Sequence, residues 1–540
     1  MMTPSKPALP LAPWPLALLC ALYLLAGLVG HDPWKTDDAV HLGVAWEFAA
    51  HGDWTSPRIV GDAWLAMPPL FHWVAALLGK GLGFLIDFHN GARLATALFG
   101  ALLFLGLART AHRLYSPAAG LGAPLLAMGT VGLLVPIHEA QPLIALLAAQ
   151  SFLHLGMARV ADNTTQDSLK GGLIAGVAMA AGLLAVGSLA VIPLVVLPLL
   201  ALLHPAWRGR STLGVVIALI LGLGLAALWP GLLALQSPEL LPTFWDKELA
   251  KLTPPAWSAE SFQDQLQLLG WAPWPILPIG LWALWAYRRQ LKTPAFFLPL
   301  VGTLLALVQV FLLAEARPLN HLLLVVPLTL LAAAGAEKLR RGAANAFDWF
   351  GMMTFTLIGG LVWLGGIAMM TGEPLRVAKN FTKAEPGFVG LWSWPALIAA
   401  ALLTVLWCWS LGRLPKSPWR SATHWAIGMV LMWGLMAALW MPWMDYGKTY
   451  RPVAASLAKA LDGSKECVLA RHLGDAQKAS LRYFIDLAPL RYNTKNRECG
   501  WLLTQGSARS ENAPAGWRKV WEGNRAGDKS EKFRLYQRAE

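Results

Sequence analysis

Long apolar runs separated by short basic clusters constrain this chain more than any other feature of its sequence. About thirteen of them approach the roughly 20 residues that a helix needs to cross a bilayer. The chain is 56% hydrophobic and 14% charged, whereas soluble proteins carry roughly a quarter charged residues. We therefore predict a polytopic α-helical membrane protein. The net charge of +13 could suggest a nucleic-acid partner, but the basic residues lie between the apolar runs, as the positive-inside rule requires.

The basic residues also orient the predicted helices. Lys6 precedes the first run, which we expect to be retained and not cleaved as a signal peptide, so the N-terminus is predicted to be cytoplasmic. The run at 69–78 is too short to cross, and we expect it to lie in the outer interface. The predicted spans are 11–30, 92–111, 118–135, 143–158, 171–187, 189–203, 213–235, 271–287, 297–313, 322–334, 349–370, 391–411 and 425–440.

This topology divides the chain into two predicted domains. Residues 1–442 form the membrane domain, with polar loops outside at 31–90 and 236–270. Residues 443–540 have soluble composition and contain short strand and helix patterns, which predict a small α/β domain outside the membrane. Cys467 and Cys499 lie in this domain. Because an outside location is oxidising, they are expected either to form a disulfide or to remain buried thiols.

Candidate site residues gather at the predicted outer ends of the helices. Charges inside a membrane are costly and usually functional, but the apolar runs here contain few. The topology instead brings four polar groups to one depth on one face, which predicts an outward-facing site. The four groups are Asp37, Asp38, His41 and Glu47; His138, Glu139 and Gln141; Asp246, Lys247 and Glu248; and Arg317, Asn320 and His321.

Asp37 and Asp38 begin a predicted helix. Both carboxylates could simply complement the helix dipole. Adjacent residues do not share a helix face, so at most one of the two should point into a site. His41 follows Asp37 by one helical turn and could orient its carboxylate.

The first polar loop resembles that of the bacterial protein O-mannosyltransferase-like superfamily, and within it the lipid A aminoarabinose transferase group. The likeness rests on an acidic pair that opens a helix, a Gly-Asp-Trp motif and a Pro-Pro-Leu motif. The residues are Asp37-Asp38, Glu47, Gly52-Asp53-Trp54, Pro57-Arg58 and Pro68-Pro69-Leu70. The resemblance implies the GT-C fold, with about thirteen spans and an extracytoplasmic C-terminal domain. It implies inverting transfer of a sugar from a polyprenyl-phosphate carrier to a lipid, glycan or protein acceptor at the periplasmic face of a bacterial inner membrane.

The resemblance also implies roles for individual residues. Asp37 matches the acidic residue of the first loop, Glu139 stands for a second acidic residue after the third span, and Asp38 is a further catalytic candidate. A carboxylate can orient or deprotonate an acceptor hydroxyl, and a cation must stabilise the departing phosphate. The candidates for substrate binding are Arg58, Arg317, Lys247, His41, His138, Gln141 and His321. For the cations, a salt bridge in an exposed loop is the alternative.

The chain departs from the family pattern at several positions. Met67 stands where the family often has lysine, and Val186-Gly187 replaces a Lys-Gly pair. No cofactor is assigned, although Asp37, His138 and Glu139 are residue types that could bind a divalent cation. Two other functions stay open: a polyprenyl-linked lipid transporter or flippase, which should carry polar residues near the bilayer midplane, and a catalytically weak scaffold paralogue.

Overall fold

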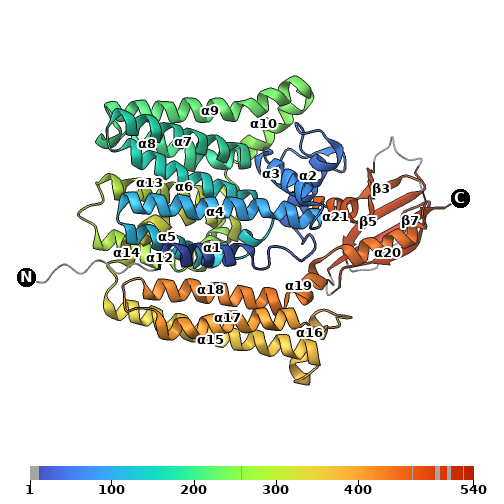
Figure 1. The fold of residues 1–540 in the computed structure, drawn as a ribbon. Coiled ribbons are helices and arrows are strands. Elements are labelled where there is room, and N and C mark those ends of the chain that lie inside the picture. Colours follow the sequence, from blue (N-terminus) through green and yellow to red (C-terminus); the bar gives the residue numbers. More distant parts are fainter. Residues whose placement is uncertain are drawn as a thin grey trace, which may run out of the picture.

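The computed structural model describes residues 11–256, 258–464, 466–492, 499–507, 513–526, 528 and 530–539. Helices run side by side through most of the molecule, and a small domain with a β-sheet lies at one end of them (Figure 1). Two shorter helices, α2 (Asp37–His51) and α3 (Leu70–Leu82), lie at the same end. This sheet-domain end of the bundle carries most of the predicted site residues.

Within the described residues, nine helices are long and apolar enough to cross a membrane, and two bent pairs raise the number to eleven. The nine are α4 (Phe88–Leu114), α6 (Pro142–Val160), α7 with η3 (Thr165–Ala190), α9 (Arg210–Gln236), α13 with η7 (Pro294–Leu313), η8 with α14 (Pro318–Ala336), α15 (Arg341–Thr371), α17 (Trp394–Arg413) and α18 (Arg420–Leu439). The bent pairs are α5 (Pro117–Met128) with Val131–His138, and α11 (Ala259–Trp271) with α12 (Ile276–Ala286).

Two shorter apolar helices, α1 (Pro13–Leu25) and η4 with α8 (Ile192–Ala201), coincide with the two remaining predicted spans. The number of thirteen spans therefore stays a prediction, while the multi-pass helical fold is confirmed. The third short apolar helix is α3, whose 13 residues extend only about 20 Å at 1.5 Å per residue. This length agrees with the expectation that 69–78 does not cross.

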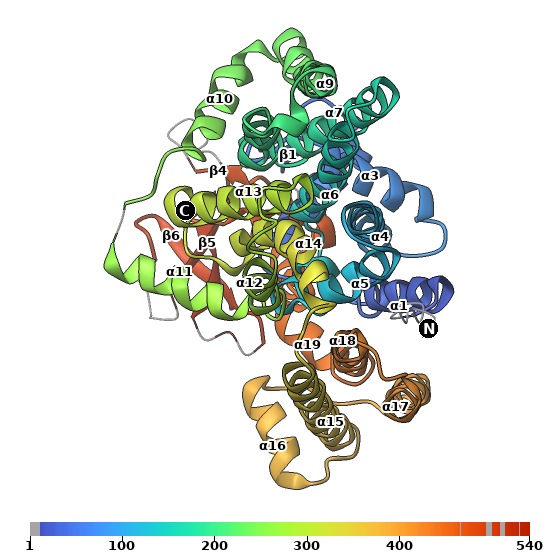
Figure 2. The ribbon, with the colours of Figure 1, turned by 90° about the vertical axis from the view of Figure 1, so that its left-hand side faces the viewer.

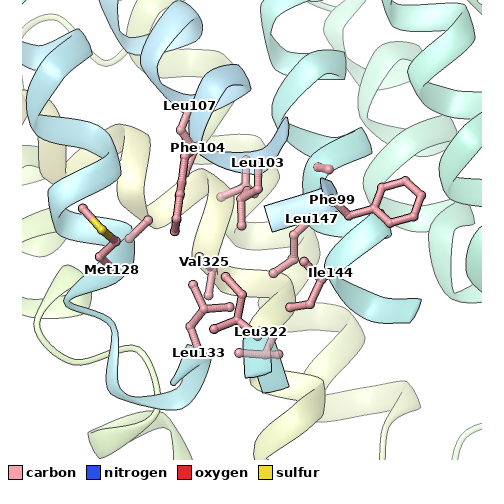
Figure 3. Packing of buried hydrophobic residues seen from close by; sticks show 14 of the residues in the cluster. Phe99, Leu103, Phe104, Leu107, Met128, Leu133, Ile144, Leu147, Leu322 and Val325 are labelled. Carbon is pink, nitrogen blue, oxygen red and sulfur yellow. The ribbon is translucent and has the colours of Figure 1, made fainter. Parts of the chain in front are cut away.

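The core of the bundle is apolar and continuous. Phe99, Leu103 and Leu107 repeat every fourth residue on α4 and belong to one buried cluster with residues of α6 and α14. Leu103 points toward Ile144 and Val325 of those two helices (Figure 3). Burial of such side chains removes apolar surface from contact with solvent and packs it densely. Seen end-on, α15, α17 and α18 form a separate lobe beside this core, with α16 (Leu375–Ala384) at its edge (Figure 2).

The C-terminal domain contains a five-stranded sheet in the order β4-β3-β5-β7-β6. Strand β3 (Val468–Arg471) is parallel to β4 (Leu490–Arg491) and to β5 (Trp501–Ser507), whereas β7 (Glu531–Arg538) is antiparallel to β5 and to β6 (Trp517–Gly523). Helices α19 (Met441–Lys448), α20 (Arg451–Leu461) and α21 (Asp475–Ile485) complete it. A disulfide joins Cys467 to Cys499, so it ties together the beginnings of two neighbouring strands.

Candidate active site

A buried ion pair fixes the start of α2. Arg93 of α4 donates from Nε and Nη2 to the two carboxylate oxygens of Asp38, at 3.0 and 2.8 Å. Asp38 also accepts hydrogen bonds from the backbone N–H groups of Trp34 and Ala140. Burial would raise the pKa of Asp38, but the Arg93 guanidinium outweighs this effect and holds the pKa at about 2. Asp38 is therefore an ionised structural anchor, and its carboxylate does not face the cavity described next.

A cavity of about 1030 Å³ lies beside α2. Asp37, Val40 and His41 line it from one face of that helix, so Asp37 and Asp38 point in different directions, as adjacent helical residues must. Other parts of the lining come from residues 131–143, from the segment after α10 (Leu241–Ala250) and from the loop before η8. The polar residues in the lining are Thr36, Asp37, His41, Gln141, Lys251, Thr253, Glu315, Arg317 and Asn320.

Two cations take part in this lining. Lys251 Nζ lies 2.6 Å from the Oε1 atom of Glu248, and Glu248 is itself buried and accepts a hydrogen bond from the Ser188 N–H group. Burial lowers the pKa of Lys251, while Glu248 acts in the opposite direction. Arg317 Nη2 lies 2.8 Å from Glu315, and both of these side chains are about two-thirds exposed, at 69% and 66%. The cavity therefore contains one firmly held cation and one exposed cation.

Two predicted cations lie outside the lining. Lys247 is exposed on α10, one helical turn before Lys251. Arg58 donates to the carboxylate of Asp53 and to the carbonyl of Gly61, which is the loop salt bridge considered as its alternative. Lys251 was missed, although it repeats Lys247 at i+4 on the predicted outer segment.

Of the three predicted histidines, only one lines the cavity. His41 lines the cavity, whereas His138 and His321 do not. The ring nitrogens of His138 face the backbone carbonyls of Leu134 and Tyr23, each at 2.5 Å. Those of His321 face two backbone carbonyls at 3.3 and 3.2 Å. These two rings hold segments of backbone together, and His138 has no nitrogen left for a metal ion.

Glu139 follows the 3₁₀ turn at 136–138 and lies just outside the lining. Its carboxylate has no hydrogen-bond partner among the described residues. Burial, reinforced by the charge of Asp38, raises the pKa of Glu139 to about 7, although Lys448 acts against this rise. Its catalytic role stays a prediction. In the described part of the chain, no group of three or more His, Cys, Asp and Glu side chains is arranged to hold a metal ion.

The C-terminal domain holds the loop that precedes α2. Arg451 donates from Nε and Nη2 to the carboxylate of Asp32, at 2.8 and 2.5 Å, and Thr449 donates to the same carboxylate. Asp445 accepts from the indole N–H of Trp34. The first turn of α2, which carries Asp37, is thus fixed by contacts from both domains.

Comparison with known proteins shows which proteins this chain is similar to in sequence and in fold. No protein-family model matches the chain. An undecaprenyl phosphate-alpha-4-amino-4-deoxy-L-arabinose arabinosyl transferase of Edwardsiella ictaluri (strain 93-146) is 26% identical over 440 residues, which is 74% of each chain. The crystal structure of ArnT from Cupriavidus metallidurans bound to undecaprenyl phosphate matches with a TM-score of 0.66 and 17% identity over 97% of both chains.

An oligosaccharyltransferase is also similar to this chain in fold, although more distantly. The archaeal oligosaccharyltransferase AglB from Archaeoglobus fulgidus, in complex with an inhibitory peptide and a dolichol-phosphate, has a TM-score of 0.51 and 10% identity. That match covers 92% of this chain and 69% of AglB. The chain therefore has the fold of the GT-C glycosyltransferases and is related in sequence to the aminoarabinose transferase group.

Proposed function

We propose that this protein moves a sugar from a polyprenyl-phosphate donor to an acceptor bound in the cavity beside α2. The proposal rests on one observation: Asp37, a carboxylate, and two cations, Lys251 and Arg317, line the same cavity. A carboxylate and phosphate-binding cations are the groups that such a transfer needs. The name of the Edwardsiella relative includes an undecaprenyl phosphate sugar, and the similar ArnT crystal structure contains bound undecaprenyl phosphate. Both support this choice of donor.

The roles follow from charge. The acceptor nucleophile attacks the anomeric carbon from the side opposite the phosphate, so the configuration inverts. The bond between that carbon and the phosphate oxygen breaks, and its electron pair leaves on the polyprenyl phosphate. Lys251 and Arg317 stabilise this added negative charge, and Asp37 orients the nucleophile and takes its proton. Met67 lines the same cavity but offers no charge, so Lys251 supplies the cation that the first loop lacks.

The orientation is part of the proposal. Helix α2, which lines the cavity, and the C-terminal domain lie at the same end of the bundle (Figure 1). The basic residues in the loops favour a cytoplasmic N-terminus. We place the C-terminal domain and the cavity in the periplasm of a bacterial cell. An alkaline phosphatase fused after Glu540 should be active, and a fusion after Arg413, at the other end of α17, should be inactive. The opposite pattern would invert the assignment.

The decisive experiment is transfer by purified protein in proteoliposomes. The Asp37→Asn variant should lose about 10²–10⁴-fold in rate, because it keeps the side-chain shape but cannot accept the proton. Lys251→Gln should also be impaired. Asp246→Asn, an exposed residue outside the lining, is the matched control and should keep the wild-type rate. The proposed role of Asp37 fails if a folded Asp37→Asn protein transfers at the wild-type rate.

A further inference from the structure

The wall of the cavity that α2 forms presents hydrogen-bond acceptors. Beside the Asp37 carboxylate lies the ring of His41, which lines the cavity although it is only 4% exposed. His41 Nδ1 lies 3.1 Å from Nε2 of His72, a fully buried residue of α3. The Nε2 atom of His41 has no partner among the described residues and is not an enclosed atom, so it is free to meet a ligand.

The backbone around His72 determines which ring nitrogens of His41 and His72 carry protons. The backbone carbonyl of Pro68 lies beside the His72 ring, and Nδ1 of His72 is buried without a hydrogen bond of standard geometry. A carbonyl can only accept, so it favours a proton on that Nδ1 and leaves Nε2 of His72 as an acceptor. His41 must then donate from Nδ1, and its Nε2 carries a lone pair. Burial lowers the pKa of His41 to about 4, which keeps this ring neutral near pH 7.

Charge is distributed unevenly around the cavity. The cations Lys251 and Arg317 come from the segments after α10 and before η8, where Glu315 accompanies Arg317. The α2 wall contributes a carboxylate and an imidazole lone pair but no cation. An anion bound against Asp37 and His41 would face two groups that can only accept, which is unfavourable. Thr36, at the start of the same helix, also lines the cavity, and its hydroxyl can donate as well as accept. Hydroxyl groups, which donate, match that wall.

We propose, resting on the proposed function, that the acceptor is a carbohydrate bound through two neighbouring hydroxyl groups, one donating to Asp37 and the other to Nε2 of His41, and that the sugar is transferred to a hydroxyl and not to a phosphate. In the transfer, the oxygen of the first hydroxyl bonds to the anomeric carbon and its proton passes to Asp37. The bond to the donor phosphate breaks, and the electron pair leaves on the polyprenyl phosphate. His41 stays neutral throughout and selects the acceptor, and His72 positions His41.

The chemical linkage of the product tests the acceptor class. Proteoliposomes receive polyprenyl-phosphate sugars extracted from metabolically labelled host cells, together with either a membrane glycolipid extract or soluble glycans from the same cells. After removal of the remaining donor, the product is treated with mild acid, which cleaves sugar–phosphate bonds but leaves glycosidic bonds to hydroxyls intact. Label that stays on either carbohydrate fraction supports the inference, and the two fractions distinguish a glycolipid from a free glycan. Label released as free sugar overturns it. If no label leaves the carrier at all, the proposed function itself fails.

Variants of the histidine pair test the recognition step. His41→Ala should raise the acceptor KM about tenfold, the usual effect of losing one hydrogen bond, and should leave the donor KM unchanged. His72→Phe should act in the same direction, because His41 loses the partner that fixes its tautomer. His41→Gln, whose side-chain oxygen can accept, should recover most of the effect. His51→Asn, at the exposed end of α2, is the control. Equal changes in both KM values, or no change in either, would overturn the role of His41.

Discussion

Two adjacent aspartates at the start of α2 have different surroundings because consecutive helical residues point about 100° apart. Asp37 is exposed to the cavity, and Asp38 is 1% exposed and paired with Arg93. The sequence predicted that only one of the two could face a site, and the family resemblance selected Asp37. The sequence alone could not show that Arg93 is the partner of Asp38, because Arg93 lies 55 residues away at the start of an apolar run. Only the packing of α2 against α4 brings the two side chains together.

The ion pair predicts how Asp38 responds to substitution. Asp38→Asn should reduce stability by about 3–5 kcal/mol, because it leaves the buried Arg93 guanidinium without its counter-charge. Thermal unfolding of the purified protein measures this loss, with Asp37→Asn as the matched neighbour that should unfold near the wild-type temperature. An Asp38→Asn protein that is as stable as wild type but inactive would instead give Asp38 a direct catalytic role.

Glu139 predicts a pH dependence of stability. Its pKa in the folded protein is raised from 4.5 to about 7, so the folded state holds a proton that the unfolded chain releases above about pH 4.5. The contribution of Glu139 to the free energy of unfolding is therefore fully present below pH 4.5 and is lost as the pH rises through 7. Between pH 5 and 8, wild type should therefore lose more stability than Glu139→Gln, which does not titrate. Parallel unfolding temperatures of the two proteins across this range would contradict the raised pKa.

At the scale of elements, composition predicted the helices well because a bilayer demands long apolar segments. Each predicted span coincides with a helix or a bent pair of helices, and the short run at 69–78 lies in α3. The lining of the cavity was harder to predict, because segments that lie far apart in the sequence contribute to it. Lys251 and Lys247 have the same chemistry one turn apart, and which of them reaches the cavity depends on how α10 lies against Gly187 and Ser188, near Glu248.

The contact between α2 and α21 predicts a steric effect. A Cβ atom at Gly43 would lie only 2.4 Å from the Cβ atom of Ala479, so Gly43→Leu should force α21 away from α2. We expect a lower unfolding temperature, faster proteolysis of the C-terminal domain and slower transfer. Gly81→Ala is the matched control, because nothing lies within 4 Å of the added atom, and alanine in a helix should be neutral or slightly stabilising. Wild-type behaviour of Gly43→Leu would show that this contact does not determine how the domain docks.

At the scale of the whole molecule, the C-terminal domain and the first polar loop form one structural unit around the cavity, although they are more than 400 residues apart. Asp32 receives hydrogen bonds from Arg451 and Thr449, at sequence separations of 419 and 417 residues. Composition identified the domain, but no local pattern could show which residues of the loop it contacts. The domain has no predicted catalytic residue, and these contacts give it a different role: it fixes the backbone that leads into Asp37.

A double-mutant cycle tests this role. Asp32→Asn and Arg451→Gln should each slow transfer and lower stability, because each leaves the other group without its charged partner. The double variant should be no worse than either single one, with a coupling energy of about 1 kcal/mol or more. Arg491→Gln, an exposed residue on β4 in the same domain, should change neither property. Additive losses would mean that the two side chains act independently, so that the domain would have to position Asp37 through its other contacts, such as those of Asp445 with Trp34.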